Sequence, residues 1–306
     1  MKCLCCGSTK YKKVITNYIY SNTGFKELFE PCTCVECKRC GLIQLNIEED
    51  IESFAKKLDR YYSMQYRTDN KNVLNEESRK WYLNRANAIA NIALERYGKE
   101  EYLNVFELGA GYGINLEYFK SVYKNSSIST YEGNTVVINH LKEKGIANKP
   151  LDTFANESLD YIILAHVLEH LLNPVETINQ CLTKLKPGGL LYIEVPNNPK
   201  WSARYFEPHL TFWNERSIRN FYQFNFKESS ELFDNGIYTT GATLPVSTLN
   251  SMLFTSLKKH HGDTEWYKKL EREEKERVSV SKATRSLDFS IPTKNGIFLK
   301  MILKKK

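Results

Sequence analysis

Four cysteines near the start of the chain are spaced for metal binding. Cys3 and Cys6 form one C-x-x-C-G unit, and Cys37 and Cys40 form a second. Each unit can place two thiolates on a tight turn, because the glycine that follows accommodates a positive φ. Four thiolates arranged in this way predict a tetrahedral zinc site with no open position, which makes the site structural.

Three further cysteines, Cys5, Cys32 and Cys34, lie in the same segment and could replace one of the four ligands. An iron–sulfur cluster is a weaker alternative, and so is a set of small buried hydrophobes or a redox pair. Two matched C-x-x-C-G units favour zinc over these alternatives. A segment as short as residues 1–50 buries little hydrophobic core, so its folding would depend on the metal. Bound zinc supplies roughly 10–16 kcal/mol of apparent folding free energy to a small finger.

A glycine-rich loop forms a second candidate site. Glu107, Gly109, Gly111 and Gly113 lie in the run E-L-G-A-G-Y-G. The glycines allow a ligand to approach the backbone closely. The run departs from the dinucleotide fingerprint G-x-G-x-x-G, because position 114 is not glycine. A carboxylate at Glu107 would repel a pyrophosphate, so the loop suits a cationic ligand; the alternative is a plain tight turn.

A single acid follows the next predicted strand. Glu132 lies 25 residues after Glu107. An acid at the end of this strand can accept hydrogen bonds from both ribose hydroxyls of a nucleoside. The alternative is a solvated acid at a strand end. Together with the glycine loop, the position favours the ribose role.

Three ionisable residues, His166, Glu169 and His170, follow the predicted strand 161–165. If they begin a helix, the residues at 166 and 170 share a face. Such a set could bind a divalent metal or supply a general base, and we favour the base. The alternative is that Glu169 and His170 only brace the loop.

An alternation of strands and helices must position these residues. The expected helices are 75–98, 114–124, 135–144 and 174–185, and the expected strands are 103–108, 128–132, 161–165, 190–195 and 296–304. Near the cysteines, 14–16 and 18–20 are expected to form short strands. The alternation implies an α/β fold with a mostly parallel sheet and helices on both faces. Ligands of such sheets bind at the carboxyl ends of the strands.

The motifs together resemble the class I S-adenosylmethionine-dependent methyltransferases, in the branch with an N-terminal zinc ribbon that acts on small molecules and sugars. The resemblance runs through E-L-G-A-G-Y-G (107–113), Y-E-G-N (131–134), L-D-Y-I-I-L-A-H-V-L-E-H-L-L-N-P (159–174) and L-K-P-G-G-L-L-Y-I-E-V-P-N (185–197). It implies a Rossmann-like fold and S-adenosylmethionine as cofactor. The sulfonium of that cofactor is a cation, which agrees with the acidic start of the glycine loop.

The resemblance also implies roles for single residues. Those expected to contact the cofactor are Glu107, Gly109, Ala110, Gly111, Gly113, Glu132, Asp152 and Ala165. Those expected to be catalytic are His166, Glu169, His170 and His209. Some small-molecule O-methyltransferases of this fold bind a metal through E-x-x-E-H. Here His166 replaces the first acid, and because imidazole is a softer ligand, Mg²⁺ is disfavoured.

The last third of the chain carries an aromatic-rich stretch that includes His209. Its rings could stack on a sugar or a planar ring, or form a packed cover over the sheet, which we favour for most of them. The expected organisation is a zinc ribbon over 1–50, a helical lead-in or lid over 51–98, and a methyltransferase core over 99–306. Within that core we expect the acceptor segment at 200–226 and a helical insertion at 250–290.

Charge and composition restrict the function. The net charge of +7 lies within residues 251–306, which hold 14 Lys+Arg and 7 Asp+Glu. The rest of the chain is therefore neutral, which disfavours nucleic acid as a partner. No apolar stretch is long enough for a membrane span or a secretory leader, so we expect a cytoplasmic chain with reduced cysteines.

We expect an enzyme that methylates a small polar acceptor, namely a sugar, a nucleotide-sugar or a glycan precursor. Methylation of oxygen or nitrogen is favoured over carbon, because the 306 residues are too few for the second α/β domain of zinc-ribbon sugar C-methyltransferases. The alternatives are an RNA or protein methyltransferase and a non-catalytic cofactor-binding scaffold. The oligomeric state is left open.

Overall fold

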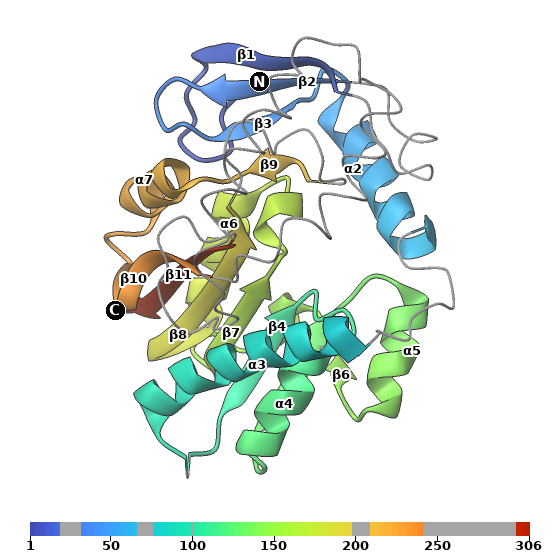
Figure 1. The fold of residues 1–306 in the computed structure, drawn as a ribbon, viewed down its shortest axis with the longest axis vertical. Helices are drawn as coiled ribbons and strands as arrows, with labels where there is room; N and C mark the ends of the chain where they lie inside the picture. The colour runs from blue at the N-terminus through green and yellow to red at the C-terminus, as the bar shows by residue number, and fades with distance from the viewer. Residues whose placement is uncertain (19–31, 66–75, 100, 198–208, 241–297) are drawn as a thin grey trace.

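Two β-sheets organise the chain in this computed structural model, which describes residues 1–18, 32–65, 76–99, 101–197, 209–240 and 298–306 (Figure 1). The larger sheet has seven strands in the order β10-β11-β8-β7-β4-β5-β6. The strands of this sheet are β4 (Asn104–Leu108), β5 (Ser127–Tyr131), β6 (Ala147–Asn148), β7 (Leu159–Ala165), β8 (Leu185–Pro196), β10 (Ser230–Thr240) and β11 (Phe298–Lys305).

Strand direction divides the large sheet into two parts. The strands β6, β5, β4, β7 and β8 are parallel to their neighbours. The last strand, β11, lies antiparallel between β8 and β10, with Phe298 opposite Pro196. The predicted mostly parallel sheet is therefore confirmed, and the final strand expected at 296–304 is found as β11. The first part of β8 is irregular, and its pairing with β7 shifts register between Leu159 and Tyr161.

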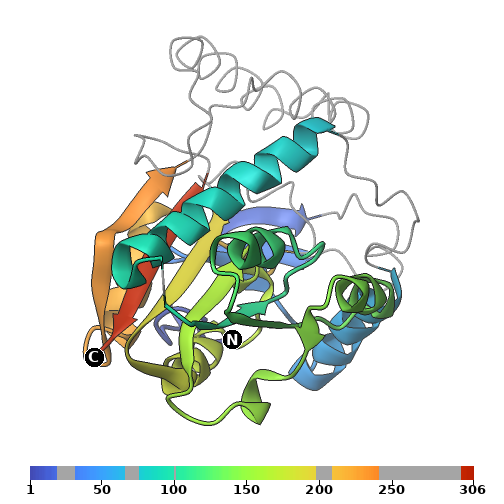
Figure 2. The same cartoon turned by 90° about the horizontal axis from the view of Figure 1, so that it is seen from below.

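Helices cover both faces of this sheet, as the alternation of elements predicts. The described helices are α2 (Ile51–Arg60), α3 (Glu76–Tyr97), α4 (Ile114–Val122), α5 (Thr135–Glu143), α6 (Pro174–Lys184) and α7 (Glu215–Asn225). Figure 2 shows α3 lying across one face of the sheet. All seven residues of β7 are buried, as expected for a parallel strand packed on both sides.

Alternate residues of the central strands enter two different cores. Ile162 and Leu164 pack in the cluster that contains Ile178 of α6. Tyr161 and Ile163 pack in the cluster that contains residues of α3, α4 and α5. Because successive side chains of a strand point to opposite faces, the continuous apolar run of β7 fills both cores and fixes the sheet between its helices.

The smaller sheet joins the cysteine-rich segment to the rest of the chain. Its antiparallel order is β1 (Tyr11–Tyr18), β2 (Cys32–Cys37), β3 (Ile43–Asn46) and β9 (Thr211–Phe212). Strand β9 follows β8 of the large sheet in the chain and pairs with β3 of the smaller sheet. The two short strands predicted at 14–16 and 18–20 are instead one strand, β1, as far as the structure describes them.

Two parts of the chain remain to be compared with the sequence analysis: residues 51–65, for which no element bounds were predicted, and segments that lie outside the described residues. Residues 51–65, where no period is evident, form α2 and a short π-helix, Tyr61–Gln65. Asp50 caps α2 by accepting a hydrogen bond from the Ser53 N–H at 2.9 Å. The predicted insertion at 250–290 and the aromatic residues before position 209 lie outside the described residues. Within the described part of the chain, no helix is both long and apolar enough to cross a membrane.

Candidate active site

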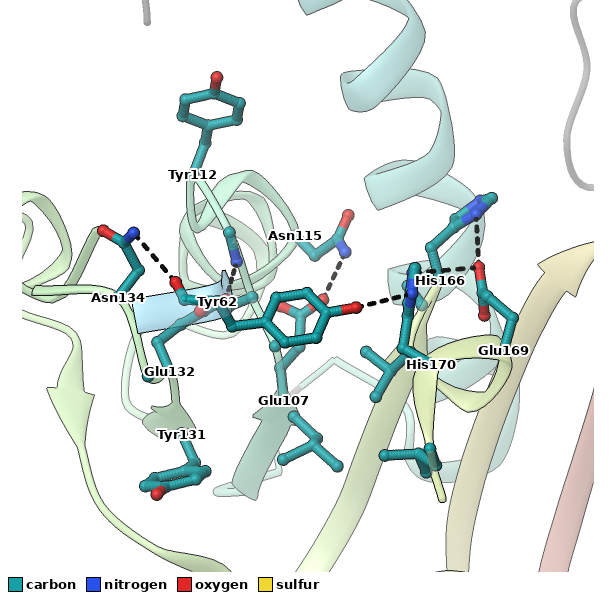
Figure 3. Close-up of a pocket in the computed structure, with 18 of the residues that line it drawn as sticks. Tyr62, Glu107, Tyr112, Asn115, Tyr131, Glu132, Asn134, His166, Glu169 and His170 are labelled. Atoms are coloured by element: carbon teal, nitrogen blue, oxygen red, sulfur yellow. Dashed lines mark hydrogen bonds and ion pairs between the residues drawn. The ribbon is translucent and has the colours of Figure 1, made fainter. Parts of the chain in front are cut away.

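A cavity of about 600 Å³ lies at the carboxyl ends of β4, β5 and β7 (Figure 3). Its walls are the glycine loop after β4, the residues after β5, the segment after β7, parts of α2 and α3, and His209. Most of the predicted site residues line this single cavity. It lies where ligands of parallel α/β sheets bind.

The glycine loop lies against the segment that follows β7. Gly109 has φ +69°, and a Cβ added there would lie 2.9 Å from Cγ2 of Val167. Its N–H donates to the carbonyl of Tyr131 at 3.0 Å. Gly113 has φ +74° but does not line the cavity. A Cβ at Gly113 would lie 2.7 Å from Cδ2 of Leu141, so this glycine allows α4 to begin close to α5.

Glu107 is a buried acid at the base of the cavity. The Asn115 amide donates to its Oε1 at 2.6 Å, whereas its Oε2 has no hydrogen-bond partner among the described residues. Burial raises the pKa of Glu107 to about 7, although Asn115 and Arg85 oppose the shift. A cation entering the cavity would favour the ionised form of this carboxyl group.

Glu132 closes the glycine loop onto the end of β5. Its Oε1 accepts a hydrogen bond from the Gly111 N–H at 2.7 Å, and its own N–H donates to Oδ1 of Asn148 at 2.8 Å. The side chain therefore lies beside the loop and lines the cavity. The ribose role of Glu132 stays a prediction.

Three imidazoles converge on one oxygen of Glu169. The acid is fully buried in the 3-10 turn Leu168–His170. Its Oε1 lies 3.4 Å from Nδ1 of His166, 3.9 Å from Nε2 of His170 and 3.9 Å from Nε2 of His209. His209 is held there because the N–H of Leu210 donates to the Glu169 carbonyl at 2.8 Å.

His166 lies between two buried carboxylates. Besides its contact with Glu169, its Nε2 lies 3.3 Å from Oε1 of Glu194 in β8. Burial alone would lower the pKa of His166, but the two carboxylates outweigh it and raise the pKa. The residue also has φ +59°, which is uncommon outside glycine. The two carboxylates fix the orientation of this ring, and the catalytic role expected of His166 stays a prediction.

His170 and His209 are the remaining basic candidates. Their rings lie 4.8 Å apart in an edge-to-face arrangement. The hydroxyl of Tyr62 lies 2.9 Å from Nδ1 of His170 (Figure 3). Burial lowers the pKa of His209 to about 3, and the neighbouring His170 acts in the same direction, whereas Glu169 opposes the shift. His209 is therefore neutral at physiological pH.

The structure does not bring every predicted residue to the cavity. Ala165 lines it at the end of β7. Asp152 does not: it is exposed in the short turn Leu151–Thr153 and borders a different hollow, next to α6. The expected contact between Asp152 and the cofactor consequently has no support from its position.

Several cavity residues were missed by the sequence reasoning. These are Tyr62, Trp81, Tyr82, Arg85, Tyr112, Asn115 and Asn134. Glu194, which contacts His166 but does not line the cavity, was also missed, although a charged residue inside the apolar run L-L-Y-I-E-V is a detectable signal. It accepts a hydrogen bond from the Tyr192 hydroxyl at 2.7 Å and lies 3.8 Å from Nζ of the buried Lys300.

Most described aromatic side chains of the expected acceptor segment are buried. Trp213, Phe221 and Phe226 pack in one cluster, with ring centroids 4.8 and 4.9 Å apart along the series. Phe224 is exposed on α7. These rings therefore cover the sheet, and none of them lines the cavity.

The four predicted cysteine ligands form one cluster. Sγ of Cys3 lies 3.5 Å from Sγ of Cys40, and Sγ of Cys6 lies 3.6 Å from Sγ of Cys37. All four sulfurs lie within 4.8 Å of one another. Tetrahedral zinc with Zn–S bonds of about 2.3 Å separates its sulfurs by about 3.8 Å, so the donor set fits zinc.

The surplus cysteines have different surroundings. The Cys5 thiol is buried and lies 3.8 Å from the Ser217 carbonyl. Cys34 is buried in the core of the smaller sheet. The side chain of Cys32 lies outside the described residues. Neither Cys5 nor Cys34 belongs to the four-sulfur cluster.

The strand order, the antiparallel last strand and the glycine loop define a Rossmann-like class I methyltransferase fold. A family described as "Methyltransferase domain" matches residues 64–227, more than half of the 306 residues. The chain belongs to this family and is an S-adenosylmethionine-dependent methyltransferase. No curated protein sequence matches the chain significantly.

Solved structures with a similar arrangement are distant in sequence. A candidate sarcosine dimethylglycine methyltransferase from Galdieria sulphuraria is 15% identical with a TM-score of 0.48, over 73% of this chain and 86% of that one. An S-adenosylmethionine-dependent methyltransferase from Archaeoglobus fulgidus is 16% identical with a TM-score of 0.45, over 72% and 94%. The plantazolicin methyltransferase BpumL is 15% identical with a TM-score of 0.46, over 74% and 85%.

Proposed function

We propose that the chain transfers the methyl group of S-adenosylmethionine to oxygen or nitrogen of a small polar acceptor, in the class of sugars, nucleotide-sugars and glycan precursors. The observation that carries this proposal is the single cavity that joins the glycine loop to the Glu169 cluster. At the glycine-loop end, backbone groups and carboxylates can bind the cofactor. At the Glu169 end, polar side chains can bind the acceptor. A cavity of about 600 Å³ is of the size that holds a cofactor and a small molecule.

At the cofactor end, Gly109, Ala110 and Gly111 provide close backbone approach, and Glu132 accepts from the ribose hydroxyls. Glu107 faces the positive charges of the cofactor. Arg85 supplies the opposite charge for the cofactor's carboxylate: it is buried and lines the cavity, and its Nε has no hydrogen-bond partner among the described residues. Ala165 borders the same region at the end of β7.

At the acceptor end, Glu169, His170 and His209 surround the place where the acceptor's proton must leave. Methyl transfer is an in-line displacement, so alignment of acceptor, methyl carbon and sulfur supplies much of the rate. His166, paired with two carboxylates, holds Glu169 in place. Rings that border the cavity, among them Tyr62, Trp81 and Tyr112, could stack on an acceptor.

The four-cysteine cluster is proposed to hold a structural zinc ion through Cys3, Cys6, Cys37 and Cys40. Four sulfurs leave no open coordination position for substrate. The cluster belongs to the segment that forms the smaller sheet, and β9 pairs with β3 at the edge of this sheet. The zinc would stabilise the attachment of this sheet to the rest of the chain.

Calorimetry with S-adenosylmethionine and a methyl-transfer assay on a sugar and nucleotide-sugar panel test the proposal. We expect micromolar cofactor binding that Glu132→Ala weakens at least 10-fold, and transfer to a member of the panel. The matched control is Glu117→Ala on the exposed side of α4. Absence of binding at millimolar cofactor, or RNA binding with a steep salt dependence, would contradict the proposal.

A further inference from the structure

We propose that Glu169, His170 and His209 bind a divalent transition-metal ion within the cavity. In the sequence, His166 is the expected partner of Glu169 and His170. In the structure, the third donor is instead His209, which comes from 39 residues further along the chain than His170. His166 is placed differently, because its second nitrogen faces Glu194.

The spacing of the three donors fits one ion. One ligand atom from each residue lies within 4.8 Å of the others. Nε2 of His170 and Nε2 of His209 both lie 3.9 Å from Oε1 of Glu169. These separations exceed the length of a hydrogen bond. Bonds of about 2.1 Å to a common metal ion place donors about 3.0–3.5 Å apart, so a small contraction completes the site.

The carboxylate of Glu169 supplies a second, independent observation. The residue is 0% exposed, and neither of its oxygens has a hydrogen-bond partner among the described residues. Burying a charged group without such partners is costly. The residue lines the cavity, so a cation that enters there can reach Oε1, whose nearest described charged neighbour is Nδ1 of His166 at 3.4 Å.

The surroundings of His170 suit a metal ligand. Histidine ligands usually donate their second ring N–H to an acceptor, which fixes the tautomer and orientation of the ring. The Tyr62 hydroxyl lies 2.9 Å from Nδ1 of His170. When Nδ1 carries the proton and donates to Tyr62, the lone pair of Nε2 faces Glu169 and can bind the ion.

The donor set selects the kind of metal. Two imidazoles and one carboxylate favour zinc, iron or cobalt over magnesium, which prefers oxygen ligands. Three protein ligands also leave a position open to the cavity. Resting on the proposed function, this position would take an acceptor hydroxyl. The ion would lower the pKa of such a hydroxyl. Its proton would pass to solvent while its oxygen bonds to the methyl carbon and the C–S bond breaks with the electron pair on sulfur.

Cobalt(II) titration of the chelator-treated full chain tests this site. We expect two equivalents with different spectra. The cysteine cluster gives thiolate-to-cobalt charge transfer, and the second site gives only ligand-field bands. Glu169→Gln and His209→Gln should each lose the second equivalent and keep the first. Tyr62→Phe should weaken the second equivalent about 10-fold. The matched control, His140→Gln on the exposed side of α5, should keep both equivalents.

Because Glu169 is buried, its replacement could impair folding. His170→Gln, at a more accessible ligand, serves as the second variant, with circular dichroism on every sample. A wild-type chain without the ligand-field bands would overturn the inference. So would persistence of these bands in folded His170→Gln and His209→Gln, or displacement of cobalt by millimolar Mg²⁺. Calorimetry with S-adenosylmethionine on the same samples reports separately on the proposed methyltransferase function.

Discussion

Nε2 of His166 lies 3.3 Å from Oε1 of Glu194, and the backbone N–H of His166 donates to the Glu194 carbonyl at 2.8 Å. The end of β7 is thus connected to β8 through both main chain and side chain. Lys300 of β11 and Arg85 of α3 approach the same carboxylate at 3.8 and 3.9 Å. This acid therefore connects four elements around the cavity.

A double-mutant cycle tests the contact between His166 and Glu194. Removing one partner weakens a buried network in which Lys300, Arg85 and Glu169 remain. His166→Ala and Glu194→Gln should therefore each lower the free energy of unfolding by about 1–3 kcal/mol. The loss of unfolding free energy in the double variant should be much smaller than the sum of the losses in the two single variants. Urea unfolding measures all three, with exposed His140→Ala as the control. Strictly additive losses would contradict a direct pairing.

Cofactor binding should depend on pH through Glu107. Its folded-state pKa of about 7 lies above its ordinary value, so much of it is protonated below pH 7. A cationic cofactor favours the carboxylate, so affinity should rise about 10-fold between pH 6 and pH 8, with release of a proton. Calorimetry in buffers of different ionisation enthalpy measures this release. Glu107→Gln should abolish both effects; an unchanged pH profile would reject the role.

The carboxyl group of Glu107 should also make the free energy of unfolding depend on pH. In the window between pH 4.5 and about 7 the folded state binds more protons than the unfolded state. The stability of the cofactor-free chain should therefore fall as pH rises through this window, by about 3 kcal/mol in total. Urea unfolding at pH 5 and pH 8 tests the slope. Glu107→Gln should remove most of it, and a slope of opposite sign would contradict the assignment.

Two glycines of the same loop should give different phenotypes. Gly109→Ala places a Cβ 2.9 Å from Val167 at the cavity wall, whereas Gly113→Ala places one 2.7 Å from Leu141 in the core. Both have positive φ, so each change costs about 1–3 kcal/mol. We expect Gly109→Ala to lower mainly cofactor affinity and Gly113→Ala mainly Tm. Gly145→Ala, at a glycine with φ +71°, open space around it and no place in the cavity wall, is the control for the φ cost alone. Equal effects on both measurements would argue against the distinction.

Zinc should be required by the N-terminal segment. Cys37→Ser should remove one zinc ion per chain, lower Tm by several degrees and expose residues 1–46 to proteases, because the small sheet then lacks its metal. Metal analysis and limited proteolysis measure these changes. Cys5→Ser removes a thiol outside the cluster and should retain the zinc. A metal-free Cys37→Ser chain with unchanged Tm would contradict a stabilising role.

Local patterns explain why the sheet and the glycine loop could be predicted. The apolar run of β7 is buried on both sides, and a glycine loop after a strand has few possible conformations. The association of Glu169 with His209 depends on the path of the chain between them, which no local pattern encodes. The bounds of helix α2, within the expected helical lead-in, could not be predicted, because only Phe54 and Leu58 are buried in it, too few for a recognisable period.

The two-residue pairing of β3 with β9 sets the position of a cavity residue. The N–H of Leu45 in β3 donates to the Leu210 carbonyl at 2.9 Å, and the N–H of Leu210 donates to the Glu169 carbonyl at 2.8 Å. His209, next to Leu210, is therefore held from two sides. Shortening or deleting the cysteine-rich segment would misalign the acceptor end of the cavity while leaving the glycine loop intact, so a truncated chain should bind its cofactor without turning it over.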